Sequence, residues 1–368
     1  MKTKFLSFAK ANAVVLIAAT AALVTSFIIP PDRAYLGYFD LKTLTCLFCV
    51  LAVVCALRNI RFFYTLAKAI IRKFKNTKYS ILALVYITFI GSMLIANDMA
   101  LLTFLPLGYF VLRTTGKEKY MAFTYIMQNI AANLGGMLTP FGNPQNLYLY
   151  TKFSIPDGEF IRIMFPPFIV AISLITALCL IFVKSEPLEI EEKAAELPKA
   201  RVAIYLVLFA LSILIVFRTI PFFIGLIIIP IALLFLDREA LKSVDYGLLL
   251  TFVFFFIFSV NMARIDAVRS FFSALLERNT LLFSALSCQV ISNVPSAILL
   301  SQFTANYRDL LLGVNIGGVG TLIASLASLI TFKAYSKDQP GNTLSYVIKF
   351  TAFNVLFFAV LVVFCALI

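Results

Sequence analysis

The chain has 368 residues, of which 61% are hydrophobic, and its formal net charge is +13. This apolar share excludes an ordinary soluble domain, and the basic excess is typical of the positive-inside bias of membrane proteins rather than of nucleic-acid binding. The sequence has no histidine and its six cysteines all lie in apolar runs, which argues against zinc and redox chemistry.

Long apolar runs without a two-residue alternation predict membrane-spanning helices, because a span needs about 20 residues and only helices and closed barrels cross a bilayer. We expect an all-α polytopic membrane protein with about nine spanning helices and two further apolar stretches of another kind. Asp40 and Asp245 each stand at the start of a span and are predicted to cap it. The predicted spans are 11–30, 39–57, 119–150, 159–184, 202–217, 220–236, 245–261, 306–334 and 343–368.

The first unusual stretch covers 79–113. As one helix it would be about 50 Å long, which is too long for one span and tight for two. Lys78 and Arg113 flank it with positive charge, so both ends are predicted to face the cytoplasm. A re-entrant helical hairpin satisfies both conditions, with Asn97 and Asp98 at its tip.

The predicted span over 119–150 contains GGMLTPFGNPQN, a run of helix breakers and bare amides. Non-helical backbone is tolerated at membrane depth only where it is buried in protein or lines a wet cavity. There, freed carbonyl groups can coordinate a cation, and helix N-termini can face an anion. The candidate binding residues in this run are Thr139, Pro140, Gly142, Asn143 and Asn146.

The second unusual stretch has the same arrangement. A hairpin is predicted over 280–303, with Ser292 and Asn293 at its tip, because Pro295 suits the first turn of a new helix better than the middle of an old one. A second Gly-rich broken helix follows over 306–334. Its candidate binding residues are Thr321, Ser325 and Ser328.

The two halves form an internal repeat. Asn133-Leu-Gly-Gly matches Asn315-Ile-Gly-Gly, and Thr139 matches Thr321, at an offset of 182 residues (321 minus 139). Each hairpin also follows an amphipathic segment that we expect to lie flat at the membrane interface. The predicted organisation is a first repeat over 1–184, a cytoplasmic linker over 185–201 and a second repeat over 202–368, with interfacial helices at 58–76 and 262–279.

Positive charges orient the chain. With a cytoplasmic N-terminus, nine of the 31 Lys and Arg residues fall outside and 22 (31 minus nine) fall inside, as the positive-inside rule requires. The first repeat then begins outside and the second inside, so the repeats are inverted and the C-terminus is external. Inverted repeats with broken helices near the midplane are typical of secondary transporters.

This pattern resembles the ion transporter superfamily, which includes divalent anion–sodium symporters, citrate transporters, arsenite permeases and one class of sodium/proton antiporters. It is most similar to the arsenite-permease and citrate-transporter-like branch. The resemblance covers nearly the whole chain and is carried by Asn97-Asp-Met-Ala-Leu-Leu, by the run over 135–146, by Ser292-Asn-Val-Pro and by the run over 315–328.

The resemblance implies a homodimer, an elevator-like motion of the hairpin domain, and two cation sites that flank an anion site. Sodium sites are then expected at Asn97 and Asn143, and at Asn293 and Thr321. The expected partners are a small anion and the lipid bilayer of a prokaryotic inner membrane, with no cofactor beyond a coupling sodium ion or proton. Neither tip repeats the Ser-Asn-Thr of dicarboxylate symporters, which leaves sodium coupling and dicarboxylate preference open.

Asp98 is the ionisable residue expected deepest in the membrane, where such groups are costly and usually functional. Burial favours the protonated form of a carboxylic acid, so we expect Asp98 to bind a coupling proton or to help bind sodium. The alternative is that it caps nearby amides.

The predicted function is secondary transport of a small carboxylate or oxyanion, coupled to protons or sodium. A sodium/proton antiporter stays open as an alternative, as does the membrane subunit of an arsenite efflux system with a separate ATPase. An enzyme is not expected, since the apolar segments contain almost no acid–base groups besides Asp98.

Overall fold

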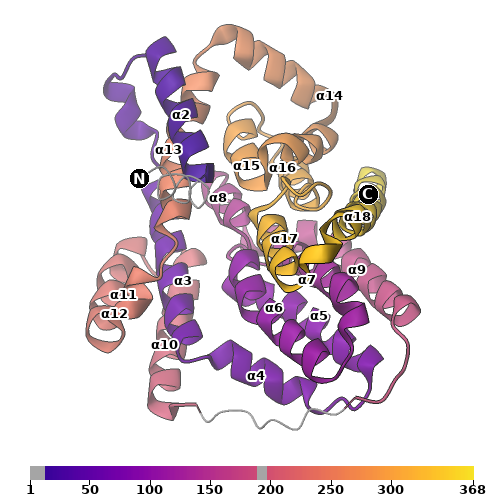
Figure 1. The fold of residues 1–368 in the computed structure, drawn as a ribbon. Helices are drawn as coiled ribbons and strands as arrows, with labels where there is room; N and C mark the ends of the chain where they lie inside the picture. Colours follow the sequence, from indigo (N-terminus) through magenta and orange to yellow (C-terminus); the bar gives the residue numbers. More distant parts are fainter. Residues whose placement is uncertain (1–12, 189–196) are drawn as a thin grey trace, which may run out of the picture.

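The computed structural model describes residues 13–188 and 197–368, and these residues form a nearly all-helical protein (Figure 1). The start of the predicted 11–30 span and the middle of the linker lie outside the described residues. Within them the β-pairing is limited to one isolated bridge, between Asn76 and Pro187. The α-helices are α2 (Ala13–Ile28), α3 (Leu41–Asn59), α4 (Phe62–Ile71), α5 (Thr77–Ile95), α6 (Asn97–Thr114), α7 (Met121–Gly135), α8 (Pro144–Lys152), α9 (Asp157–Phe182), α10 (Lys199–Val216), α11 (Phe222–Leu236), α12 (Arg238–Lys242), α13 (Tyr246–Ala263), α14 (Asp266–Ile291), α15 (Asn293–Leu300), α16 (Tyr307–Ile316), α17 (Leu326–Asp338) and α18 (Thr343–Leu367), with 3-10 turns η1 (Arg33–Gly37), η2 (Glu118–Tyr120), η3 (Gly136–Leu138) and η4 (Pro340–Asn342).

Six helices of the described chain are long and apolar enough to cross a membrane. They are α3, α5, α9, α10, α13, and α18 together with η4. The expectation of an all-α polytopic membrane protein is confirmed. The lengths differ from the sequence-based expectation in two ways. Helix α11 has only 15 residues, and α5, expected as one arm of a hairpin, is itself long enough to span.

Two long helices begin where the sequence predicts a cap. Asp40 Oδ1 accepts the Thr43 N–H at 3.0 Å at the start of α3, and Asp245 Oδ1 accepts the Leu248 N–H at 2.9 Å at the start of α13. Each carboxylate satisfies a backbone donor that the first helical turn leaves without a partner. Both predicted caps are therefore confirmed.

Two helix pairs turn back at a single residue with the same unusual backbone. Helices α5 and α6 meet at Ala96, with φ 62° and ψ 153°, and α14 and α15 meet at Ser292, with φ 75° and ψ 159°. This region of backbone space is nearly exclusive to glycine, and a residue with a side chain costs about 1–3 kcal/mol there. A residue keeps such a strained backbone only where the surrounding structure enforces it. The matching angles of Ala96 and Ser292 therefore show that the two tips are equivalent.

Both predicted broken helices are interrupted at equivalent positions. Helix α7 leads through η3 and a loop to α8, and α16 leads through a loop to α17. The residue before each second helix is extended: Asn143 has φ −140° and ψ 142°, and Ser325 has φ −148° and ψ 152°. The offset is again 182 residues (325 minus 143). Pro144 fills the first position of α8, where its missing N–H has no cost.

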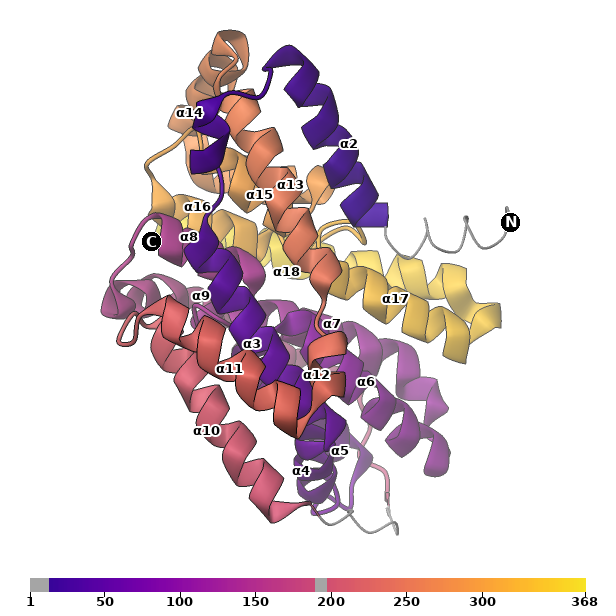
Figure 2. The same ribbon diagram turned by 90° about the vertical axis from the view of Figure 1, so that its left-hand side faces the viewer.

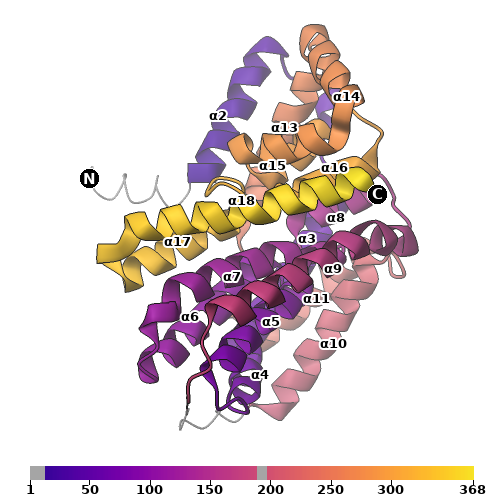
Figure 3. The same cartoon turned by 90° about the vertical axis from the view of Figure 1, so that its right-hand side faces the viewer.

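The helices form two groups (Figure 1). The flanking group consists of α2, α3 and α10–α13. Figure 2 shows it from its exposed side. The hairpin group consists of α5–α9, α15–α18 and residues 280–291 of α14. Figure 3 shows it with α18 and α9 in front. Within the flanking group α2 packs along α13, and α10 and α11 pack along α3; within the hairpin group α5 packs along α7 and α14 along α16.

Among the described residues, two helical segments connect the groups. Helix α4 leads from α3 to α5, and the first half of α14 leads from α13 to the second hairpin (Figure 1). These are the segments predicted as interfacial helices over 58–76 and 262–279. The backbone of α14 departs from helical geometry at Asn279, with φ −165° and ψ 90°, where the second hairpin begins. Their position at a membrane interface stays a prediction.

Candidate functional site

The first hairpin tip is held by amide side chains. Asn97 Oδ1 accepts the Asp98 N–H at 2.9 Å, and Asn97 Nδ2 donates to Asn133 Oδ1 on α7 at 3.1 Å. Asn133 in turn accepts, through its backbone oxygen, a hydrogen bond from Asn143 Nδ2 at 3.2 Å. Asn97 and Asn143, the predicted first sodium pair, are thus joined through Asn133. The predicted sodium ion itself stays a prediction.

The loop of the first broken helix is fastened by Asn146. Its Nδ2 lies 3.2 Å from each of the carbonyl oxygens of Gly136, Met137 and Thr139. Thr139 Oγ1 donates to Met93 O on α5 at 2.7 Å, which ties the loop to the hairpin. Pro140 and Gly142 are buried in the same loop. The run that breaks the helix is therefore an ordered structure with its own hydrogen bonds.

The two repeats meet in one network. Asn315 on α16 donates through Nδ2 to Asn146 Oδ1 at 2.6 Å, and its Oδ1 accepts from Asn143 Nδ2 at 3.3 Å. In the other direction, Asn129 Nδ2 on α7 donates to Ser328 Oγ at 3.4 Å, and Ser328 Oγ lies 3.1 Å from Ser325 Oγ. These bonds connect side chains of the first repeat with side chains of the second.

The second tip rests on the second loop. The Asn293 N–H and Ser292 Oγ both donate to Ala324 O, at 3.0 and 3.3 Å, and Asn293 Oδ1 accepts the Val294 N–H at 2.9 Å. This last bond repeats the one between Asn97 and Asp98. Thr321 is held by Gln289, whose Oε1 accepts the Thr321 N–H at 2.8 Å. Ala324 links Asn293 to Thr321, because its own N–H donates to Thr321 O at 3.2 Å. The sodium site at Asn293 and Thr321 stays a prediction.

Three buried oxygens near the first tip and loop have no hydrogen-bond donor among the described residues. They are Asp98 Oδ1, Asn143 Oδ1 and Gln145 Oε1. An unpartnered acceptor in a protein interior costs about 1–3 kcal/mol, so such oxygens call for an explanation. All three are suited to ligate a hard cation, and the Asp98 carboxylate alone can also take up a proton.

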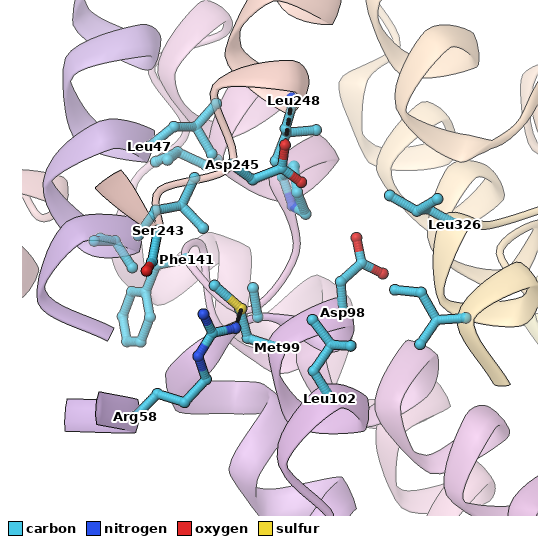
Figure 4. A pocket seen from close by; sticks show the side chains of 16 residues that line it. Leu47, Arg58, Asp98, Met99, Leu102, Phe141, Ser243, Asp245, Leu248 and Leu326 are labelled. Atoms are coloured by element: carbon cyan, nitrogen blue, oxygen red, sulfur yellow. Dashed lines mark hydrogen bonds between the residues drawn. The ribbon is translucent and has the colours of Figure 1, made fainter. Parts of the chain in front are cut away.

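A cavity of about 270 Å³ lies between the two helix groups. Figure 4 shows the Asp98 carboxylate projecting into it from α6 and the Asp245 carboxylate bonded to Leu248 at the start of α13. The Arg58 guanidinium approaches Met99 in the same view. The other lining side chains are mostly aliphatic or aromatic: Leu47, Val50, Leu51, Leu102, Phe141, Leu147, Leu248, Leu326 and Ile330.

Of the twelve predicted site residues, Asp98 alone lines this cavity. The others lie at or next to the two tips and the breaks of the two interrupted helices. Sequence reasoning missed Asn129, Gln145 and Gln289 as members of the polar network, and Arg58 as a cavity residue. Asn133 and Asn315 carried a signal, since they occupy equivalent positions in the repeat. Arg58 carried none, because it begins a segment whose charges fit an interfacial helix.

Comparison with known proteins decides the family. A protein-family model described as "Citrate transporter" matches residues 5–308. The chain belongs to this citrate transporter family. It is 34% identical over 293 residues to a Methanocaldococcus jannaschii protein named "Uncharacterized transporter MJ0456", covering 79% of this chain and 80% of that one. It is 30% identical over 279 residues to the Escherichia coli "Inner membrane protein YbiR", covering 74% of each.

The family places the chain among membrane transporters and agrees with the resemblance found in the sequence. It also explains the architecture. Strained tips and interrupted helices are unnecessary for a passive helical bundle, and in a transporter they supply polar backbone inside the membrane.

Proposed function

We propose that the protein is a secondary active transporter that moves a small anion, coupled to protons or sodium, by displacement of the hairpin group along the flanking group. The observation that carries this proposal is the cavity between the groups, since both contribute to its lining. Leu47, Arg58 and Asp245 come from the flanking group, whereas Asp98 and Phe141 come from the hairpin group. Relative motion of the groups would therefore carry one wall of the cavity past the other.

Asp98 is the proposed coupling residue. It stands in the first turn of α6, where the helix N-terminus favours negative charge. One of its oxygens is buried and accepts no hydrogen bond from the described residues. A proton or a sodium ion at that oxygen would remove the cost of leaving the carboxylate without a partner. Binding of the coupling ion at Asp98 would also lower the repulsion of an anion that enters the cavity.

A sodium/proton antiporter is the second candidate. It is favoured by the Asp98 carboxylate, which could exchange a proton for a cation without an organic substrate, and by the amide oxygens of Asn143 and Gln145, which could help to ligate that cation. We further propose an inner-membrane location with a cytoplasmic N-terminus, supported by the charge distribution of the loops. A homodimer is the expected assembly from the family resemblance.

Uptake into proteoliposomes tests this proposal. Purified protein would be given labelled carboxylates, sulfate and arsenite under an imposed proton or sodium gradient. We expect gradient-dependent uptake of an anion, and its loss in Asp98→Asn, because the amide cannot carry the coupling proton and binds sodium poorly. Asp40→Asn is the matched control, since asparagine also caps helices and Asp40 lies outside the cavity.

The outcomes separate the candidates. Sodium–proton exchange without anion uptake, lost in Asp98→Asn, would assign the antiporter function. Coupled uptake by Asp98→Asn at the wild-type rate would show that Asp98 has only a structural role at the start of α6.

A further inference from the structure

Arg58 occupies a distinctive position in the cavity. It lies in the last turn of α3, in the flanking group, and faces the space into which Asp98 projects from the opposite group. It also lines a second cavity of about 320 Å³ with Arg61 and Tyr64, and Leu102 is shared between the two. Arg58 therefore stands where the two cavities adjoin.

The guanidinium of Arg58 is paired with a weak hydrogen-bond acceptor. Arg58 Nη1 donates a hydrogen bond to Met99 Sδ at 3.4 Å, and a thioether sulfur is a weak acceptor. None of the ion pairs of the described residues includes Arg58, whereas Arg264 lies 2.7 Å from Asp32 and Lys117 lies 2.6 Å from Glu186. A guanidinium carries five N–H donors in a fixed fork that matches a carboxylate or similar oxyanion.

The remainder of the cavity limits what such an anion can be. Apart from Arg58 the charged lining groups are the carboxylates Asp98 and Asp245, and most other lining residues are apolar. A second or third negative group on a ligand would face these carboxylates or apolar side chains, where an unpaired charge is very costly. The volume of about 270 Å³ also lies below that of most drug-sized ligand pockets.

We propose that Arg58 is the anion-binding residue of the cavity, and that the substrate is a small monoanion with one carboxylate or comparable oxyanion head and an apolar body. The head pairs with the Arg58 guanidinium in place of Met99 Sδ, and the body contacts side chains such as Leu51, Leu102 and Phe141. Citrate, with three carboxylates, is a poor ligand of this cavity. This inference rests on the proposed anion transport and narrows its substrate class.

Binding to the purified protein in detergent tests the inference, by calorimetry with two probes. Isovalerate has one carboxylate on a branched apolar body, and citrate has three carboxylates. We expect the wild-type protein to bind isovalerate more tightly than citrate. Arg58→Gln should weaken isovalerate binding by at least about tenfold, because a charge-assisted hydrogen-bond pair is lost. Arg58→Lys should fall between the two, since it keeps the charge and loses the fork.

Arg61→Gln is the matched control. Arg61 lines the neighbouring cavity and not this one, so its removal should leave the affinity for isovalerate within about threefold, the scatter typical of a surface change. Thermal unfolding of each variant checks that the fold is intact.

Three results would overturn the inference. They are unchanged isovalerate affinity in Arg58→Gln, equal losses in Arg58→Gln and Arg61→Gln, and tighter wild-type binding of citrate than of isovalerate. None of these three results would contradict the proposed anion transport, provided that coupled uptake is observed in proteoliposomes. Absence of uptake and of binding for every anion tested would instead remove the proposed function and this inference together.

Discussion

Gly136 leaves room for the amide of Asn143. A Cβ at position 136 would collide with Asn143 Oδ1 and lie 2.7 Å from Gly142 O, both in the loop between η3 and α8. Asn143 Oδ1 is also one of the buried oxygens without a donor among the described residues. The glycine therefore allows two backbone segments and the Asn143 amide to approach closely, which a larger residue would prevent.

We predict that Gly136→Ala lowers both stability and transport. The added methyl group must displace Asn143 or the loop, and overpacking of this kind typically costs about 1–3 kcal/mol. Gly158→Ala in the first turn of α9 is the control, since its Cβ would meet nothing within 4 Å and alanine favours a helix. Thermal unfolding and anion uptake measure the two effects. Wild-type behaviour of Gly136→Ala would show that the loop accommodates a side chain and that the close approach is dispensable.

The tip residues show how far single positions can be predicted. Asn97 and Asn293 are predicted at the tips because length and flanking charge favour a hairpin in the first stretch and Pro295 marks a helix start in the second. They do occupy equivalent tips with equivalent hydrogen bonds. The partners could not be predicted in the same way. Asn133 stands out in the repeat, but its bond to Asn97 depends on which helix packs beside the tip. The Ala324 carbonyl that accepts from Asn293 carries no sequence signal at all.

At the scale of elements, the segment after α9 fastens the base of the first hairpin. Glu186 accepts hydrogen bonds from Lys117 and Lys119, each at 2.6 Å, in the turn that follows α6. Its backbone oxygen accepts the Thr77 N–H at 2.9 Å, at the start of α5. One residue therefore holds both ends of the hairpin together, and it does so outside the membrane-spanning helices.

This arrangement predicts a pH dependence. The two lysines lower the pKa of Glu186 from its ordinary value of 4.5 to about 2. A carboxylate whose pKa is lower in the folded state stabilises that state above its unfolded pKa, and the contribution is lost as the pH falls from about 4.5 towards 2. We predict that Glu186→Gln unfolds at a lower temperature than the wild type at pH 7, and that the difference narrows as the pH falls below about 4.5.

Glu239→Gln is the control for this comparison. It removes an exposed ion pair with Lys242, one helical turn away, and exposed ion pairs contribute little to the free energy of unfolding. A Glu186→Gln difference that is constant from pH 7 to 3, or equal to that of Glu239→Gln, would contradict a specific clamp at the hairpin base.

At the scale of the whole molecule, the sequence predicts the order of elements better than their mutual placement. The repeat offset and the helix breakers are local patterns, and they indicate both hairpins and both interrupted helices. The cavity is different, because Arg58, Asp98 and Asp245 are far apart in the chain and meet only when the two helix groups pack. The contact between the repeats is tertiary in the same way, since Asn315 on α16 donates to Asn146 of the first repeat.

Arg218 is a contact between the two groups. It lies between α10 and α11 and donates to Tyr150 O at the end of α8 and, at 3.3 Å, to Ile155 O. Its guanidinium carbon also lies 4.0 Å from the centre of the Tyr150 ring. If the groups move past one another, these interactions belong to one conformation and must break in the other, so they stabilise the arrangement seen here.

We therefore predict that Arg218→Gln shifts the protein away from this conformation. Hydrogen bonds from a charged donor contribute roughly 1.5–3 kcal/mol, enough to change a two-state population by about tenfold or more. Hydrogen–deuterium exchange in nanodiscs should rise in the cavity walls, over 47–58 and 96–102, and stay constant within the hairpin group over 125–133. Arg269→Gln is the control, because Arg269 donates to Ala263 O at the end of the preceding helix and not to the hairpin group. If exchange in the Arg218→Gln variant were faster over the whole chain, the substitution would have destabilised the fold in general. Unchanged exchange in both cavity walls would mean that the two groups move as one body.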